Sequence, residues 1–219
     1  MEEEKRTSIA VIKRLPRYYR YLGDLMDNDI KKTSSKELSK IMNITASQIR
    51  QDLNNFGCFG QQGYGYDVHS LYLEIKKILG INQPHNMILI GVGNIGQALA
   101  NYGGFRNRGF KFTAAFDKDK DMIGKKVGGI QVFDIDTLSD YLSKNEVDIA
   151  VLTAPKASVY DISKVLSKHK IKGIWNFSSV DLEYDDEDAM VENIHLTDSL
   201  MTLSYRLNER EIIKNLRGH

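Results

Sequence analysis

The chain has one cysteine, Cys58, and three prolines among its 219 residues. A single thiol excludes a disulfide framework within the chain and a metal site built on cysteine pairs. No apolar run approaches the roughly 18 residues that a membrane-spanning helix requires. The first residues, MEEEKR, lack the features of a secretory signal. We therefore expect a cytoplasmic protein with no membrane association and no bound metal.

Catalytic groups are also scarce. No paired carboxylates, metal-ligand spacing or nucleophile elbow occurs. Only one histidine, His195, falls near the end of a predicted strand, where it could approach a bound cofactor. The other four look like surface residues: His69, His85, His169 and His219. An enzyme that transfers hydride usually places a general acid or base over the nicotinamide. The sequence therefore predicts a protein that is not an enzyme.

A glycine motif in the middle of the chain is its most specific feature. Residues 87–96 read MILIGVGNIG, an apolar strand followed by the pattern G-x-G-x-x-G and then a helix-like run. The first glycine permits a tight turn, the second lets the backbone approach a pyrophosphate, and the third lets the helix pack on the strand. We expect the helix N-terminus to bind a dinucleotide phosphate through Gly91, Val92, Gly93, Asn94, Ile95 and Gly96.

An acidic residue lies at the position where a dinucleotide-binding fold contacts the ribose. Asp117 follows Gly96 by 21 positions and ends the second predicted strand. A carboxylate there accepts the ribose hydroxyls and repels a 2′-phosphate. This spacing predicts NAD(H) rather than NADP(H) as the cofactor, although Lys118 stands beside the acid.

Alternating strands and helices continue after the motif, which is typical of a Rossmann fold. Six strands are predicted, at residues 87–90, 110–116, 130–133, 148–152, 173–176 and 191–196. Residues 117–129 are expected to form a charged loop, and residues 198–216 a terminal helix.

The residues before the motif predict a different module. Helices are expected over residues 8–26, with Pro16 starting a second part, over residues 34–42, and from Thr45 onward. Ser34 with Glu37, and Thr45 with Gln48, have the spacing of a capping box. The stretch GCFGQQGYGYDV then resembles a hairpin. Helices followed by a hairpin indicate a winged helix.

The winged helix is expected to bind DNA. From Val11 to Arg50, nine Lys and Arg stand against four acids, a net charge of +5. The second helix of a helix-turn-helix places its N-terminal residues against base edges, and a wing contacts the backbone. The expected DNA-binding residues are Lys36, Thr45, Ser47, Gln48, Arg50, Gln51, Gln61, Gln62 and Tyr64.

Other readings of these patterns are an NAD-dependent oxidoreductase with a small helical appendage, and a CoA- or nucleotide-binding scaffold. The helical module alone is also compatible with a bundle that binds protein instead of DNA.

The two halves together resemble the Rex family of redox-sensing transcriptional repressors over essentially the whole chain. The segments that carry the resemblance are RLPRYYRYL at 14–22, SSKEL at 34–38, TASQIRQDLNNFG at 45–57, GYGYDV at 63–68, GVGNIGQALANY at 91–102 and KGIWNFSSVDL at 172–182. The resemblance implies an α/β protein with a winged-helix DNA-binding domain (residues 1–80), a Rossmann NAD(H)-binding domain (81–197) and a C-terminal dimerisation helix (198–219) exchanged between subunits.

It also implies a function. Members are homodimers that bind a palindromic operator when NADH is scarce and leave it when NADH binds. By position, Tyr102 would lie near the nicotinamide, and Arg20 would join an interdomain contact with residue 195. Many relatives have Asp where this chain has His195. On the terminal helix, an apolar stripe fits the dimer interface: Leu196, Leu200, Leu203 and Leu207.

Overall fold

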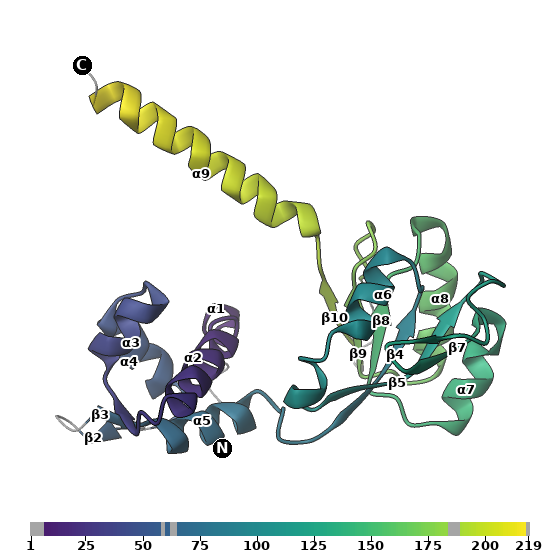
Figure 1. Cartoon of the computed structure of the whole chain (residues 1–219), viewed down its shortest axis with the longest axis horizontal. Coiled ribbons are helices and arrows are strands. Elements are labelled where there is room, and N and C mark those ends of the chain that lie inside the picture. The colour runs from purple at the N-terminus through teal and green to yellow at the C-terminus, as the bar shows by residue number, and fades with distance from the viewer. Residues whose placement is uncertain (1–6, 58–59, 62–64, 184–188, 218–219) are drawn as a thin grey trace, which may run out of the picture. The chain divides into compact units, whose positions relative to one another are not determined.

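The computed structural model describes residues 7–57, 60–61, 65–183 and 189–217. The chain divides into two compact units, Met1–Gln83 and Pro84–His219 (Figure 1). Among the described residues, no helix is both long enough and apolar enough to cross a membrane.

The first unit consists of helices and a small antiparallel sheet. Its helices are α1 (Ile9–Ile12), α2 (Leu15–Asp27), α3 (Ser35–Met42), α4 (Ala46–Asn54) and α5 (Val68–Ile78). Strands β1 (Lys32–Thr33), β2 (Gly60–Gln61) and β3 (Gly65–Asp67) pair in the order β1-β3-β2. The predicted helices and hairpin are therefore confirmed. Pro16 stands in the first turn of α2, where its missing N–H leaves no hydrogen bond unmade.

Helix ends in this unit follow local side-chain chemistry. The Ser34 hydroxyl accepts a hydrogen bond from the Glu37 N–H, and the Glu37 carboxylate accepts one from the Ser34 N–H. This predicted capping box is confirmed. At α4 only half of the prediction holds, because Thr45 caps the Gln48 N–H but the Gln48 side chain turns to Asp52 instead.

The second unit is built on a seven-stranded sheet in the order β10-β9-β8-β4-β5-β7-β6. Its strands are β4 (His85–Ile90), β5 (Phe110–Asp117), β6 (Lys126–Val127), β7 (Ile130–Asp134), β8 (Ile149–Leu152), β9 (Gly173–Asn176) and β10 (Met190–Asn193). All pairs are parallel except β6 with β7. The short strand β6 corrects the expectation of a plain loop over residues 117–129.

Alternate residues of the central strand β4 face two separate apolar layers. Ile88 and Ile90 pack in the layer that includes residues of α7 (Leu138–Lys144) and α8 (Lys156–Lys168). Met87 and Leu89 pack in the other layer, with residues of α6 (Asn94–Asn101). Because both faces are covered, the central strands are apolar throughout. Short 3₁₀ turns at Arg106–Arg108 and Ile135–Thr137 complete the unit.

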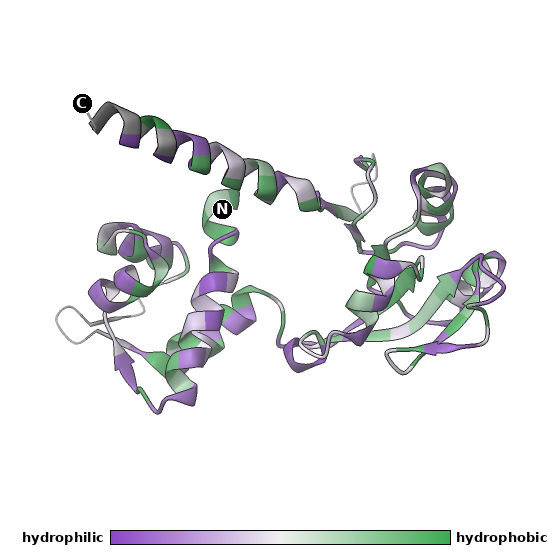
Figure 2. Cartoon of the chain, turned by 45° about the horizontal axis from the view of Figure 1, so that its top comes forward, coloured by the Kyte–Doolittle hydropathy of each residue, from purple (hydrophilic) through white to green (hydrophobic). Residues whose placement is uncertain are grey.

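The C-terminal helix α9 (Leu196–Arg217) starts two residues earlier than predicted, and β10 stops at Asn193 instead of 196. The Asp198 N–H already donates to the His195 carbonyl, so helical hydrogen bonding begins there. Figure 2 shows hydrophobic and hydrophilic residues alternating along α9. Each leucine of the predicted stripe is more than half exposed: Leu196, Leu200, Leu203 and Leu207.

Candidate functional site

The glycine turn leaves room for a ligand at one position and none at the other two. Gly91 has φ +95°, and a Cβ there would lie 2.8 Å from the Thr153 carbonyl carbon. A Cβ on Gly96 would collide with the Gly91 carbonyl oxygen. A Cβ on Gly93 would meet no heavy atom within 4 Å. The first and third glycines are therefore required by packing, whereas the second opens onto free space.

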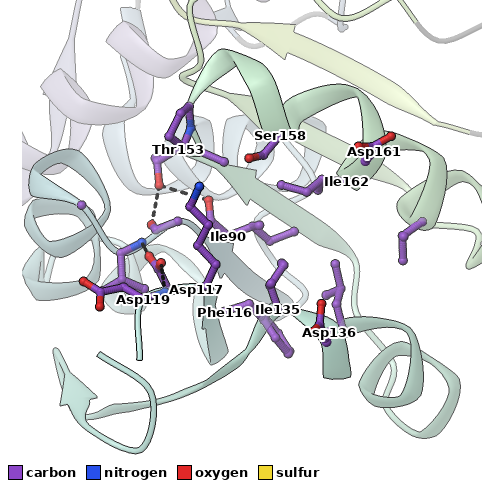
Figure 3. Close-up of a pocket in the computed structure, with 18 of the residues that line it drawn as sticks. Ile90, Phe116, Asp117, Asp119, Ile135, Asp136, Thr153, Ser158, Asp161 and Ile162 are labelled. Carbon is purple, nitrogen blue, oxygen red and sulfur yellow. Dashed lines mark hydrogen bonds between the residues drawn. The ribbon is translucent and has the colours of Figure 1, made fainter. Parts of the chain in front are cut away.

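A cavity of about 660 Å³ lies beside this turn (Figure 3). Its walls include the ends of β4, β5 and β8, the 3₁₀ turn at Ile135 and the first turns of α8. This is the carboxyl edge of a parallel sheet, where such folds bind their ligands. The cavity volume is in the range of ordinary cofactor sites.

Asp117 orders the turn as well as lining the cavity. One carboxylate oxygen accepts a short hydrogen bond from the Val92 N–H of the turn, and the other accepts from the Asp119 N–H at 2.9 Å. An ionised carboxylate has about four acceptor positions. With two of these positions used by backbone N–H groups, the Asp117 carboxylate can still accept hydrogen bonds from ribose hydroxyls.

The lining of the cavity as a whole is acidic. Its lining contains one cation, Lys118, against four carboxylates: Asp117, Asp119, Asp136 and Asp161. Charges of one sign raise the free energy of a ligand group of the same sign. This wall therefore disfavours an additional phosphate on the bound nucleotide.

Several lining residues were missed from the sequence. The Thr153 hydroxyl contacts the Gly91 carbonyl oxygen at 2.6 Å and so joins the end of β8 to the turn. Pro155 and Ser158 follow on the same wall. These residues belong to no sequence motif. Only their position directly after the apolar strand 148–152 indicates a binding role, because such folds bind ligands at the carboxyl ends of their strands.

Tyr102 does not line this cavity. It ends α6, its side chain is exposed, and its ring meets that of Phe105 edge-on at 4.8 Å between centroids. It borders a second cavity of about 590 Å³, together with Arg106 and Lys111. The structure therefore does not bring Tyr102 and Asp117 into one cavity.

The two residues expected to form an interdomain switch belong to different units. Arg20 is exposed on α2, with its guanidinium 5.2 Å from the centre of the Tyr21 ring. His195 lies between β10 and α9, and its Nε2 is 2.7 Å from an Asp181 carboxylate oxygen. The Asp181 hydrogen bond, with the charge of that carboxylate, raises the pKa of His195 above its ordinary value.

We expect this pairing to be visible in an NMR titration of the His195 ring. Because the folded-state pKa is raised, the ion pair stabilises the fold fully below the ordinary histidine pKa, near 6.5, and is lost as the pH rises through the folded value. Replacing Asp181 with asparagine should lower the His195 pKa. Replacing Asp198, a weaker electrostatic neighbour, should lower it less. Equal pKa values in wild type and Asp181→Asn would contradict the assignment.

The predicted DNA-reading helix presents polar residues on one side. Ile49 and Leu53 are buried, while Thr45, Ser47 and Gln51 are exposed, as is Lys36 on α3. Arg50 is exposed and donates to the Ser35 hydroxyl at 3.0 Å. Gln62 and Tyr64 lie outside the described residues, as does the side chain of Gln61.

Within the described part of the chain, no group of three His, Cys, Asp or Glu side chains could hold a metal ion.

Comparisons with known proteins cover both units. Residues 6–54 match a family described as "Putative DNA-binding protein N-terminus", and residues 82–180 match the family described as CoA binding domain. The redox-sensing transcriptional repressor Rex of Clostridioides difficile (strain 630) is 56% identical over 205 residues, covering 94% of this chain and 97% of that protein. The Rex repressor of Thermoanaerobacter pseudethanolicus (strain ATCC 33223 / 39E) is 51% identical over 218 residues, covering 100% and 97%.

Solved structures of RSP, a Rex-family repressor, are also similar to this chain over almost its whole length. The protein RSP in complex with β-NAD⁺ and operator DNA has a TM-score of 0.88 and 50% identity, covering 97% of this chain and 98% of RSP. RSP in complex with β-NADH also has a TM-score of 0.88, with 47% identity over 97% of this chain and 99% of RSP.

Proposed function

This chain belongs to the Rex family of redox-sensing transcriptional repressors, and from that premise we propose that it couples operator binding to the NADH/NAD⁺ ratio. It binds DNA when NADH is low and leaves it when NADH binds. The observation that carries the proposal is the presence of both modules in one chain. Over 97% of its length the chain aligns with RSP, a Rex-family repressor whose structures contain operator DNA, NAD⁺ and NADH.

The residues of the two modules then have distinct roles. The turn from Gly91 to Gly96 holds the pyrophosphate at the N-terminus of α6, and Asp117 holds the adenine ribose. The DNA contacts come from α3, α4 and the wing. They are Lys36, Thr45, Ser47, Gln48, Arg50, Gln51, Gln61, Gln62 and Tyr64. Tyr102 lies near the nicotinamide of the working dimer, and Arg20 and His195 take part in the response to it.

The acidic cavity supports NAD(H) over NADP(H). Asp117 and Asp119 line the cavity at the end of β5, and Asp136 lines it from the 3₁₀ turn at Ile135–Thr137. An NADP(H) 2′-phosphate would add negative charge there, so we expect NADPH to release operator poorly even at concentrations where NADH is saturating.

Discrimination between the two redox states must come from the nicotinamide end. NAD⁺ and NADH share their phosphates and adenosine, and a ligand shifts an equilibrium only by its difference in affinity for the two states. Allosteric coupling free energies are typically about 1–3 kcal/mol. NADH is proposed to favour a closed homodimer, in which the two α4 helices no longer match successive major grooves about 34 Å apart.

We propose that this regulation proceeds without catalysis, in the cytoplasm, where the operator DNA is. The rival is an NAD-dependent oxidoreductase, which would consume NADH steadily with a small carbonyl substrate. The match to the CoA binding family concerns the unit that carries the glycine turn, and CoA therefore serves as a control ligand.

The test follows fluorescence anisotropy of a labelled operator together with absorbance of NADH. The expected result is that NADH releases the DNA, that CoA and NADPH do not at the same concentration, and that NADH absorbance stays constant. Release by all of these ligands alike, or steady loss of NADH with a carbonyl compound, would contradict the proposal.

A further inference from the structure

The side chain of Asp52 on α4 is fully buried and accepts four hydrogen bonds. Arg14 donates to both carboxylate oxygens at 2.7 Å, the Tyr18 hydroxyl donates at 3.0 Å, and the Gln48 amide nitrogen donates at 2.8 Å. Burial alone would raise the pKa of Asp52, but the hydrogen bonds from Arg14, Gln48 and Tyr18 outweigh it and hold the pKa below its ordinary value. Asp52 is therefore ionised, and an ionised carboxylate can accept hydrogen bonds but cannot donate them.

This acceptor determines which way the Gln48 amide points. A glutamine amide has one acceptor oxygen and two N–H donors, and its two ends are otherwise interchangeable. Because ionised Asp52 accepts but cannot donate, it holds the nitrogen end of Gln48. The amide oxygen and the second N–H stay available to an outside partner, because Gln48 is only partly buried.

An adjacent acceptor and donor form the pattern that reads adenine. In the major groove, adenine presents the N6 amino donor beside the N7 acceptor, and a glutamine amide binds both. Gln48 stands in the first turn of α4, the part of a recognition helix that meets base edges.

We propose that Asp52 is a positioning residue for base recognition, which fixes the Gln48 amide so that it reads adenine in each operator half-site. Arg14 and Tyr18, from the start of α2, hold the carboxylate in place. The amide thus loses little further freedom on binding. This inference rests on the proposed function, because it requires that α4 enter the major groove of an operator.

The experiment uses the full chain and an operator selected with it from random DNA. Each adenine of a half-site is replaced in turn by 7-deazaadenine, which pairs normally but lacks the N7 acceptor. At one adenine, this replacement is expected to weaken wild-type binding about tenfold. Gln48→Ala should bind the unmodified and modified operators equally.

Asp52→Asn separates positioning from a structural role. An asparagine can donate as well as accept, so Gln48 is no longer held nitrogen-inward, and discrimination against 7-deazaadenine should fall to about twofold or less. In the Gln48→Ala background, Asp52→Asn should change the discrimination ratio no further. Tyr72→Phe is the matched control: it removes a 2.6 Å hydrogen bond to the Tyr19 hydroxyl elsewhere in the same unit. Tyr72→Phe should discriminate between the unmodified and 7-deazaadenine operators as wild type does, even if the lost hydrogen bond lowers its melting temperature.

Binding is compared well below each variant's thermal transition, so that the ratio reports folded protein. Two results would overturn the inference while leaving the proposed function intact. One is that Asp52→Asn discriminates against 7-deazaadenine as fully as wild type does. The other is that wild-type binding does not change when any adenine is replaced. A chain that selects no DNA at all would contradict the proposed function and the inference with it.

Discussion

Replacing Gly93 with alanine is expected to give a repressor that folds and binds operator but no longer leaves it when NADH is added. The added Cβ meets no protein atom within 4 Å, and the Gly93 backbone, at φ −72°, suits any residue. In the proposed site, the methyl group instead occupies the space that the pyrophosphate needs. Overpacking of this kind typically costs about 1–3 kcal/mol, or roughly a 5- to 150-fold loss of NADH affinity. Calorimetry with NADH and thermal unfolding of the free protein measure the two effects separately.

Gly96→Ala is the matched comparison, because its Cβ would collide with the protein itself. It meets the Gly91 carbonyl oxygen and comes within 3.0 Å of the Thr153 hydroxyl oxygen. This variant should lose both NADH affinity and stability, by about 1–3 kcal/mol of unfolding free energy. If Gly93→Ala kept wild-type NADH affinity, the turn would not be the pyrophosphate site.

A charge in the apolar stripe of α9 should abolish tight operator binding. Leu203 is half exposed, as are Leu200 and Leu207 on the same side of the helix, so this face has little cover within one chain. In a homodimer that buries the stripe, Leu203→Glu places two carboxylates in the interface. A monomer would bind one half-site only, and loss of bivalent binding weakens affinity by about 10²- to 10⁴-fold.

The control for that variant is Asn208→Glu, which adds the same charge to an exposed position on a different side of α9. It should remain dimeric in sedimentation analysis and bind operator as wild type does. A Leu203→Glu protein that stays dimeric and keeps its operator affinity would show that the stripe is not the dimer interface.

The parts of the structure that local chemistry determines could be predicted from the sequence. The capping box at Ser34 and the glycine turn depend on residues a few positions apart, and both form as expected. The parallel order of the sheet follows from strands that are apolar throughout and separated by helices. The family resemblance, carried by several motifs at once, gave the fold class and function, and the comparisons confirm both.

Long-range contacts could not be predicted in this way. Arg14 and Asp52 are 38 positions apart, and nothing in either segment indicates that they pair. Gln48 has the spacing of a capping residue, but a buried anion competes more strongly for its amide than a helix-end N–H does. The two-residue strand β6 was missed because only its pairing with β7 distinguishes it from a loop.

Ratio sensing is tested most directly by operator release at a fixed total of NADH plus NAD⁺. Anisotropy of a labelled operator is followed as the NADH/NAD⁺ ratio is varied, at two saturating totals tenfold apart. Because both forms compete for one site through the same phosphates and adenosine, the two release curves should coincide when plotted against the ratio. Release that follows the total concentration instead, or that NAD⁺ alone produces as well as NADH does, would contradict the account.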